Sequence, residues 1–200
     1  MRRSALAFAL IAALSAPCGA EPRRTAAEIM DILMWAREPV GGPFALIDHT
    51  GTSRTERDFR GKLLLIYFGF TYCPDVCPTD LQNIGLALDQ LGAVSDKVQP
   101  LFVTVDPERD TAAHLAQYVP MFHPRLIGLT GDASAIRAAA DAYKVYYAKV
   151  SNERGDDYTV DHTAFTYLIG ADGKYLGFLP PGTAPERIAD ILRQQTALIP

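Results

Sequence analysis

Two cysteines, Cys73 and Cys77, stand four positions apart, directly after a continuous apolar run at residues 63–70. An apolar run of this length predicts a central strand that is buried on both faces. In α/β sheets, ligands and catalytic groups gather at the carboxyl ends of such strands. A disulfide between these cysteines would close a very short loop and stabilise the fold only weakly. The pair is therefore a candidate for a functional role rather than for a structural disulfide.

The chemistry of this pair depends on how the next helix begins. Pro78 disfavours helical geometry at Cys77, so we expect the helix to begin at Pro78, with both thiols on a loop at its N-terminus. Thiolates are stabilised there, and two neighbouring thiolates are soft ligands suited to Cu(I). From the spacing alone, a redox dithiol without metal is the alternative, although such motifs usually place two residues between the cysteines. Structural zinc is disfavoured because the chain has no second cysteine pair.

A third metal ligand would have to come from one of four histidines. His49 falls in a predicted surface turn and His114 in a predicted exposed helix, so solvent exposure is expected for both. His123 precedes a proline between a helix and a strand. A packing role is as well supported there as a role as a ligand. His162 leads into a predicted strand. It approaches the cysteines if that strand lies beside the one ending at Phe70, which the sequence alone leaves open.

The order of the predicted elements indicates the fold class. Apolar periodicity and turn residues predict helices at residues 26–37, 79–91, 106–118, 133–143 and 185–194. The same signals predict strands at 44–48, 63–70, 98–105, 125–129, 145–150, within 159–169, and at 175–179. Strands that alternate with helices and end in a late hairpin and a helix predict an α/β fold. We expect a central mixed sheet with helices on both faces and an N-terminal hairpin extension.

The first twenty residues differ from the rest of the chain. A short basic start, an apolar stretch and small residues at 18–20 predict a secretory signal peptide that is cleaved after Ala20. A short uncleaved membrane anchor is the alternative, and Pro17 disfavours lipidation of Cys18. We expect a leader at 1–20, an N-terminal segment at 21–40 and one domain at 41–200. The protein is then exported to the periplasm, either free or tethered to the inner membrane.

Composition narrows the class of partner. Hydrophobic residues make up 48% of the chain and charged residues 21%, which is typical of a soluble globular protein. The formal net charge is −4 and there is no long basic run, so nucleic acid is not an expected partner. A monomer is the default expectation.

Four motifs, in the same order along the chain, resemble the Sco/SenC family. They are Gly-Phe-Thr-Tyr-Cys-Pro-Asp-Val-Cys-Pro at 69–78, Val-Thr-Val-Asp-Pro-Glu-Arg-Asp-Thr at 103–111, Ile-Gly-Leu-Thr-Gly at 127–131 and Val-Asp-His at 160–162. The resemblance covers roughly residues 40–195. It implies a thioredoxin-like fold in which Cys73, Cys77 and His162 bind one copper ion, as Cu(I) or Cu(II).

The resemblance also implies a partner. Members of this family assist assembly of the CuA centre of cytochrome c oxidase, so its CuA subunit is the expected partner. Other periplasmic copper chaperones and thiol reductants are further candidates. Many relatives keep an N-terminal membrane anchor, whereas the apolar stretch here is short and rich in alanine.

Several acidic residues near these motifs have two interpretations each. Asp75 either tunes the thiolates and approaches Cu(II), or bonds local backbone N–H groups in a turn. Asp161 either orients His162 or caps a turn. Asp106 is expected to start a helix, with contact to the site as the alternative. The acidic loop near residue 155 is expected to be solvated, with metal binding as the alternative, and contains Glu153, Asp156 and Asp157.

Four functions compete at this point. A copper metallochaperone would release its ion by ligand exchange. A thiol–disulfide oxidoreductase would need both cysteines and no histidine, which leaves open whether the protein is an enzyme. A thiol peroxidase would need an arginine beside Cys73, and none is near in sequence. A disulfide-bearing interaction module is the alternative without metal or catalysis.

Overall fold

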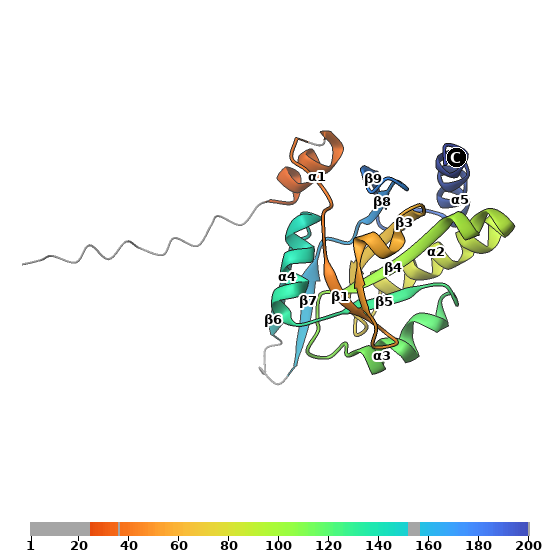
Figure 1. Cartoon of the computed structure of the whole chain (residues 1–200). Helices are drawn as coiled ribbons and strands as arrows, with labels where there is room; N and C mark the ends of the chain where they lie inside the picture. Colours follow the sequence, from red (N-terminus) through yellow and green to blue (C-terminus); the bar gives the residue numbers. More distant parts are fainter. Residues whose placement is uncertain (1–24, 36, 152–156, 200) are drawn as a thin grey trace, which may run out of the picture.

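A seven-stranded mixed sheet forms the centre of the molecule (Figure 1). The computed structural model describes residues 25–35, 37–151 and 157–199. The strands of this sheet are β1 (Ala45–Asp48), β2 (Ser53–Thr55), β3 (Leu63–Gly69), β4 (Val98–Thr104), β5 (Ile127–Thr130), β8 (Thr166–Ile169) and β9 (Tyr175–Leu179). Their order is β2-β1-β5-β4-β3-β8-β9. Strands β3, β4 and β5 are parallel, and all other neighbouring pairs are antiparallel.

Strands β3 and β4 hold the middle of the sheet because of their sequences. Every residue of both strands is buried. Strand β3 is the uninterrupted apolar run expected of a parallel strand covered on both faces, whereas β4 also buries the polar residues Gln99 and Thr104. The register pairs Gly69 at the end of β3 with Thr104 at the end of β4, so the loops that follow both strands leave the sheet at the same edge.

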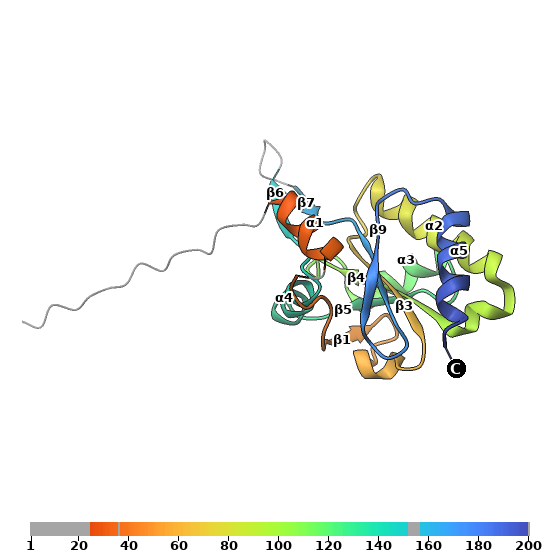
Figure 2. The ribbon, with the colours of Figure 1, turned by 90° about the horizontal axis from the view of Figure 1, so that it is seen from above.

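Helices cover both faces of the sheet. They are α1 (Ala26–Trp35), α2 (Val76–Leu91), α3 (Ala112–Tyr118), α4 (Ala133–Ala142) and α5 (Pro185–Thr196). Figure 2 shows α1 and α4 on one side of the sheet and α2, α3 and α5 on the other. Three 3₁₀ turns complete the elements, namely η1 (Glu56–Phe59), η2 (Gly92–Lys97) and η3 (Val119–Met121). The predicted α/β class, mixed sheet, helices on both faces and N-terminal hairpin are confirmed.

A separate two-stranded sheet consists of β6 (Tyr147–Ser151) and β7 (Tyr158–His162). The two strands pair antiparallel with Tyr147 opposite His162. The sequence predicted one strand within residues 159–169, and the structure instead divides this stretch between two sheets. Its first part pairs with β6, and its second part, β8, crosses to β3. Alternating side chains indicate an extended chain but do not identify its partner strand.

Two predicted helix starts are wrong. Helix α2 begins at Val76 rather than Pro78, since a proline is tolerated in a first turn whose N–H groups lack intrahelical partners. Helix α3 begins at Ala112 rather than Asp106, because Thr111 caps it by accepting a hydrogen bond from the His114 N–H. Residues 106–110 form a turn in which the Asp110 N–H donates to the Asp106 carbonyl at 2.9 Å.

The start of the described chain packs on the core. Ile29, Ile32 and Leu33 of α1 are buried, and the Tyr175 hydroxyl of β9 donates to the Leu33 carbonyl at 3.1 Å. No helix within the described residues has both the length and the apolar character needed to cross a membrane. The predicted leader at residues 1–20, including Cys18, lies outside the described residues.

The approach of α2 to the segment after α3 depends on Gly85. A Cβ at this position would lie 2.5 Å from the backbone carbonyl oxygen of Phe122. We therefore expect Gly85→Ala to lower the free energy of unfolding by about 1–3 kcal/mol, despite the better helix propensity of alanine. Urea denaturation of the reduced, metal-free protein measures this change. Gln82→Ala, at an exposed position of the same helix, is the control and should stay within about 0.5 kcal/mol of the parent.

Candidate metal centre

Three side chains from distant parts of the chain converge at one edge of the sheet. Cys73 lies in the loop after β3, Cys77 is the second residue of α2, and His162 is the last residue of β7. Their sulfur and nitrogen ligand atoms all lie within 4.8 Å of one another. Cys77 Sγ lies 3.3 Å from His162 Nε2. Within the described residues this is the one group of three or more His, Cys, Asp or Glu side chains close enough to share a metal ion.

The space for the Cys77 sulfur comes from a glycine. Gly69 ends β3, and a Cβ at this position would lie 2.9 Å from both Cys77 Sγ and Tyr67 Cε1. Such contacts are too short for any side chain to fit without displacing the sulfur. Cys77 is fully buried, whereas Cys73 is half-buried and is the thiol that faces outward.

The environment of the two thiols gives them opposite acidity. A hydrogen bond from the Cys77 thiol, followed by one from His162, lowers the pKa of Cys73 to about 3. The backbone N–H groups of Asp75, the N-cap residue of α2, and of Cys77 in its first turn also donate to this sulfur. The shared proton and the burial of Cys77 raise the pKa of Cys77. In the reduced protein Cys73 is therefore a thiolate, and Cys77 carries the proton.

The orientation of His162 is set by its own strand end. Its Nδ1 lies 3.2 Å from the carbonyl oxygen of Thr163, which can only accept a hydrogen bond. Nδ1 thus carries a proton and donates to this carbonyl, while Nε2 faces the sulfurs, as in many metal sites. The rings of Phe70 and Tyr67 meet the imidazole edge-on, with centroids at 5.8 and 6.4 Å.

The two candidate carboxylates do not make the contacts expected of them. Asp161 is exposed, and within the described chain no hydrogen bond joins it to His162, whose Nδ1 faces the Thr163 carbonyl instead. Successive side chains of a strand point to opposite faces, which separates Asp161 from its neighbour. Asp75 is exposed at the N-cap position of α2, and its side chain makes no capping hydrogen bond.

A buried aspartate fixes the start of the cysteine loop. Asp110 accepts hydrogen bonds from the backbone N–H and the hydroxyl of Thr71, at 3.0 and 2.6 Å, and from the Thr104 hydroxyl at 2.6 Å. His114 Nε2 donates to the Thr71 hydroxyl at 2.9 Å, and its ring stacks on Tyr72 with centroids 5.6 Å apart. The expectation that His114 is simply solvated is therefore wrong, because α3 packs against this loop.

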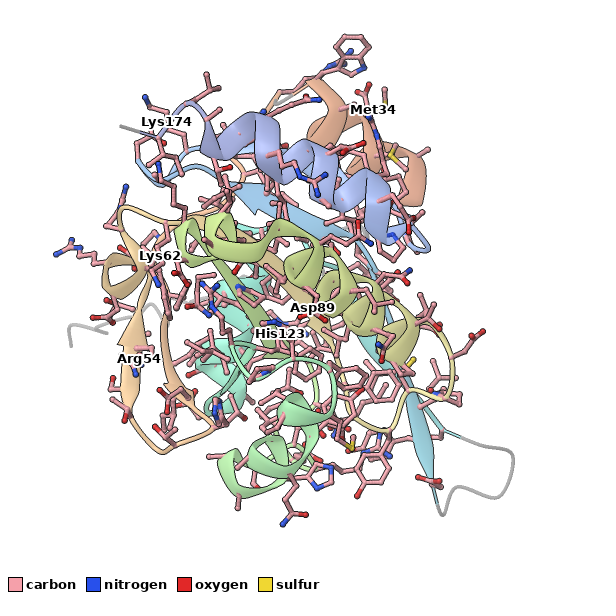
Figure 3. The ribbon with its side chains drawn as sticks, turned by 90° about the vertical axis from the view of Figure 1, so that its right-hand side faces the viewer. Met34, Arg54, Lys62, Asp89, His123 and Lys174 are labelled. Carbon is pink, nitrogen blue, oxygen red and sulfur yellow. The ribbon has the colours of Figure 1, made fainter. Side chains whose placement is uncertain are left out.

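The remaining histidines lie away from the three ligand atoms. His49 Nδ1 accepts a hydrogen bond from the Gly128 N–H at 3.2 Å. Figure 3 shows His123 beside Asp89 on α2, and His123 Nε2 lies 3.6 Å from the Asp89 carboxylate. Asp157 is the described member of the predicted acidic loop and lies 3.4 Å from Arg109, while Glu153 and Asp156 are outside the described residues.

Sequence reasoning favoured a helix start for the turn after β4 and gave contact of Asp106 with the site only as the alternative. Asp106, Arg109 and Asp110 do not supply a ligand, but they contact the loop and the hairpin that do. Their signal was present as an acidic and basic motif directly after a buried strand. Its interpretation as a helix start concealed this role, since hydrogen-bond partners 39–52 positions away cannot be read from local sequence.

Two sulfurs and one imidazole form a soft donor set. Thiolates favour Cu(I), and imidazole nitrogen extends the set to Cu(II). Two adjacent thiols of unequal acidity can also attack a disulfide and then form one themselves. The geometry therefore permits metal binding and thiol–disulfide exchange at the same place.

Comparison with known proteins decides the family. The family model SCO1/SenC matches residues 34–197. The chain belongs to the SCO1/SenC family. It is 46% identical over 158 residues to the mitochondrial protein SCO2 homolog of Bos taurus, a match that covers 78% of this chain and 59% of that protein. The chain thus spans less than two thirds of the length of this relative.

Solved structures of Sco proteins share the fold. ScoI of Bradyrhizobium japonicum, solved with copper bound, is 43% identical, with a TM-score of 0.73, over 78% of this chain and 99% of that one. BsSco, described as a member of the Sco family of cytochrome c oxidase assembly proteins, is 26% identical, with a TM-score of 0.60, over 80% and 97%. The predicted thioredoxin-like fold and family membership are confirmed.

The acidity of Cys73 can be measured directly. Because its pKa is lowered to about 3, we expect iodoacetamide to alkylate it at nearly the same rate at pH 5 and pH 8. Cys77→Ala removes the strongest of the hydrogen bonds to Cys73, so its rate should fall about tenfold between pH 8 and pH 5. His162→Ala should move the rate in the same direction, and His49→Ala serves as its control. A parent rate that falls tenfold per pH unit over this range would contradict the hydrogen-bonded pair.

Proposed function

We propose that this SCO1/SenC protein carries one copper ion on Cys73, Cys77 and His162 and delivers it to a partner protein. The convergence of two sulfurs and one imidazole nitrogen within 4.8 Å carries the proposal. The donor types fit copper, because thiolates suit Cu(I) and imidazole suits Cu(II). ScoI, which is similar over nearly its whole chain, was solved with copper bound.

In this function copper is the cargo that the protein transfers. The number of protein ligands and their exposure explain how the ion can be released. Three protein donors leave a coordination position open for a thiolate or imidazole of the partner. Cys73 is half-buried and Cys77 fully buried, so an incoming ligand meets the metal on the Cys73 side. Oxidation of the two cysteines to a disulfide removes both thiolate ligands, and the redox state of the pair therefore gates copper binding.

The target we propose is the CuA centre of cytochrome c oxidase. Family membership supports this target, as does the similarity to BsSco, described as a member of the Sco family of cytochrome c oxidase assembly proteins. The CuA-bearing subunit is then the recipient, and other periplasmic copper chaperones and thiol reductants act before it. The protein works as an exported, periplasmic monomer, free or tethered by its N-terminal segment.

A second candidate is a thiol–disulfide oxidoreductase that reduces the cysteines of the same partner. The unequal acidity of the two thiols favours it. The Cys73 thiolate attacks the partner disulfide, forms a mixed disulfide and releases one partner thiolate, which takes up a proton. Cys77 then loses its proton and displaces the second partner sulfur as a thiol. The partner gains two electrons and two protons, and Cys73 and Cys77 end as a disulfide.

Copper titration tests the three-ligand site. We expect the reduced protein to bind one Cu(I) and, separately, one Cu(II). His162→Ala should weaken Cu(II) binding at least 100-fold and Cu(I) binding much less, because imidazole matters more to Cu(II). Competition with a chelator measures both affinities, and His49→Ala is the matched control. A His162→Ala variant that binds both ions as tightly as the parent would exclude the proposed ligand set.

Transfer to a soluble CuA domain separates the two candidate functions. The copper-loaded protein should metallate a CuA domain whose cysteines are already reduced, and His162→Ala should fail to deliver Cu(II). Mass spectrometry of both proteins follows the metal and the disulfides. If the parent instead leaves the reduced domain without copper but reduces its disulfide form, and His162→Ala does so at the parent rate, the oxidoreductase function replaces the chaperone.

A further inference from the structure

The hairpin that carries His162 is not part of the central sheet. In the described part of the chain, strands β6 and β7 pair with each other and with no strand of the seven-stranded sheet. The cysteine loop, by contrast, follows directly from β3 in the middle of that sheet. On its C-terminal side His162 is tied to the central sheet, because β8 begins at Thr166 and pairs with β3. On its N-terminal side, the placement of the hairpin depends on the side chains that dock it onto the rest of the molecule.

Arg109 lies between the two ligand-bearing segments. Its Nη1 donates to the Tyr158 carbonyl of β7 at 3.0 Å, and its guanidinium lies over the Tyr158 ring, 3.8 Å from the centroid. The same guanidinium lies 4.7 Å from the ring centroid of Tyr72, the residue before Cys73. One side chain thus contacts the neighbour of a cysteine and the strand that ends at His162.

Asp106 accepts hydrogen bonds from both Arg109 and Tyr158. Its side chain is fully buried, with Oδ2 accepting from Arg109 Nε at 2.5 Å and Oδ1 accepting from the Tyr158 hydroxyl at 2.8 Å. Burial of the carboxylate strengthens hydrogen bonds to charged donors. On the outer side, Lys149 of β6 pairs with Glu108 at 2.6 Å. Three residues of one turn therefore bind both strands of the hairpin.

We infer that the Asp106–Arg109 pair is the latch that docks the His162 hairpin onto the cysteine loop, and that Arg109 is a positioning residue for His162. The inference rests on the proposed copper function for its consequence but not for its geometry. Arg109 contacts no ligand atom and acts by fixing where the imidazole stands. Without the latch the cysteine loop is still held by Asp110 and β3, whereas β7 loses its contacts at Tyr158, and His162 at the end of β7 shifts relative to the sulfurs.

The latch predicts a defect that depends on the oxidation state of copper. Arg109→Gln keeps a polar side chain but removes the charge and most of the forked donors. It should weaken Cu(II) binding at least tenfold, because Cu(II) depends on the imidazole, and weaken Cu(I) binding less than threefold. In a His162→Ala background the same substitution should have no further effect on Cu(II) affinity, since a positioning residue acts only through the group it positions.

The control is Arg125→Gln. Arg125 is also largely buried and bridges two segments, donating to Ser95 and to the Val98 carbonyl at 2.8 and 2.7 Å, but on a different part of the sheet. It should lose thermal stability without any selective loss of Cu(II). Tyr158→Phe keeps the ring and carbonyl that Arg109 contacts and removes only the hydroxyl bond to Asp106, so its Cu(II) loss should lie between parent and Arg109→Gln.

A metal-free measurement separates failure of the latch from failure of the copper function. In the reduced apoprotein, nuclear Overhauser contacts between the His162 ring and Cys77 should be present in the parent and Arg125→Gln and absent in Arg109→Gln. Contacts that persist unchanged in Arg109→Gln overturn the inference. So does a Cu(II) loss that is as large in the His162→Ala background as in the parent. A parent that shows the contacts but binds no copper would contradict the proposed function and leave the inference about the latch intact.

Discussion

The contact between Cys77 Sγ and His162 Nε2, at 3.3 Å across 85 positions of sequence, is the constraint on which this protein depends. The two side chains come from different parts of the fold. The sulfur lies in the first turn of the helix that follows a strand in the middle of the sheet. The imidazole lies at the end of a hairpin outside that sheet. Gly69 leaves the space in which the sulfur fits, and the hydrogen bond from Nδ1 to the Thr163 carbonyl orients Nε2 toward it.

The same geometry makes the two sulfurs unequal. Burial behind Gly69 and the shared proton raise the pKa of Cys77, while Cys73 collects hydrogen bonds from Cys77, His162 and the first turn of α2. A buried protonated thiol beside an accessible thiolate suits two kinds of exchange. One exchanges ligands on a metal, and the other exchanges partners in a disulfide. Both begin at Cys73, which explains why a copper chaperone and a thiol reductant are hard to separate by inspection of this site.

The turn after β4 organises the site without supplying a ligand. Asp110 fixes the start of the cysteine loop by hydrogen bonds to Thr71. Asp106 and Arg109 bind each other and the hairpin, which they contact at Tyr158. Parallel strands β3 and β4 end side by side, so the turn after β4 necessarily lies next to the loop after β3. Two neighbouring aspartates can therefore each serve one ligand-bearing segment. Charged side chains buried in this way require such partners to offset the loss of water.

The sequence by itself determined the parts of the fold that follow from local patterns. The apolar run before Cys73 predicted a central strand, and the spacing of the two cysteines with the family motifs indicated the metal site and its third ligand. Only the tertiary structure decided that β7 and β8 belong to different sheets, that Thr163 rather than Asp161 faces His162 Nδ1, and that Arg109 contacts the hairpin. The physical reason is that hydrophobic periodicity records only what a residue needs from its own strand or helix. Strand pairings, and contacts such as Asp110 with Thr71 or Cys77 with His162, which lie 39 and 85 positions apart, depend on how the whole chain packs.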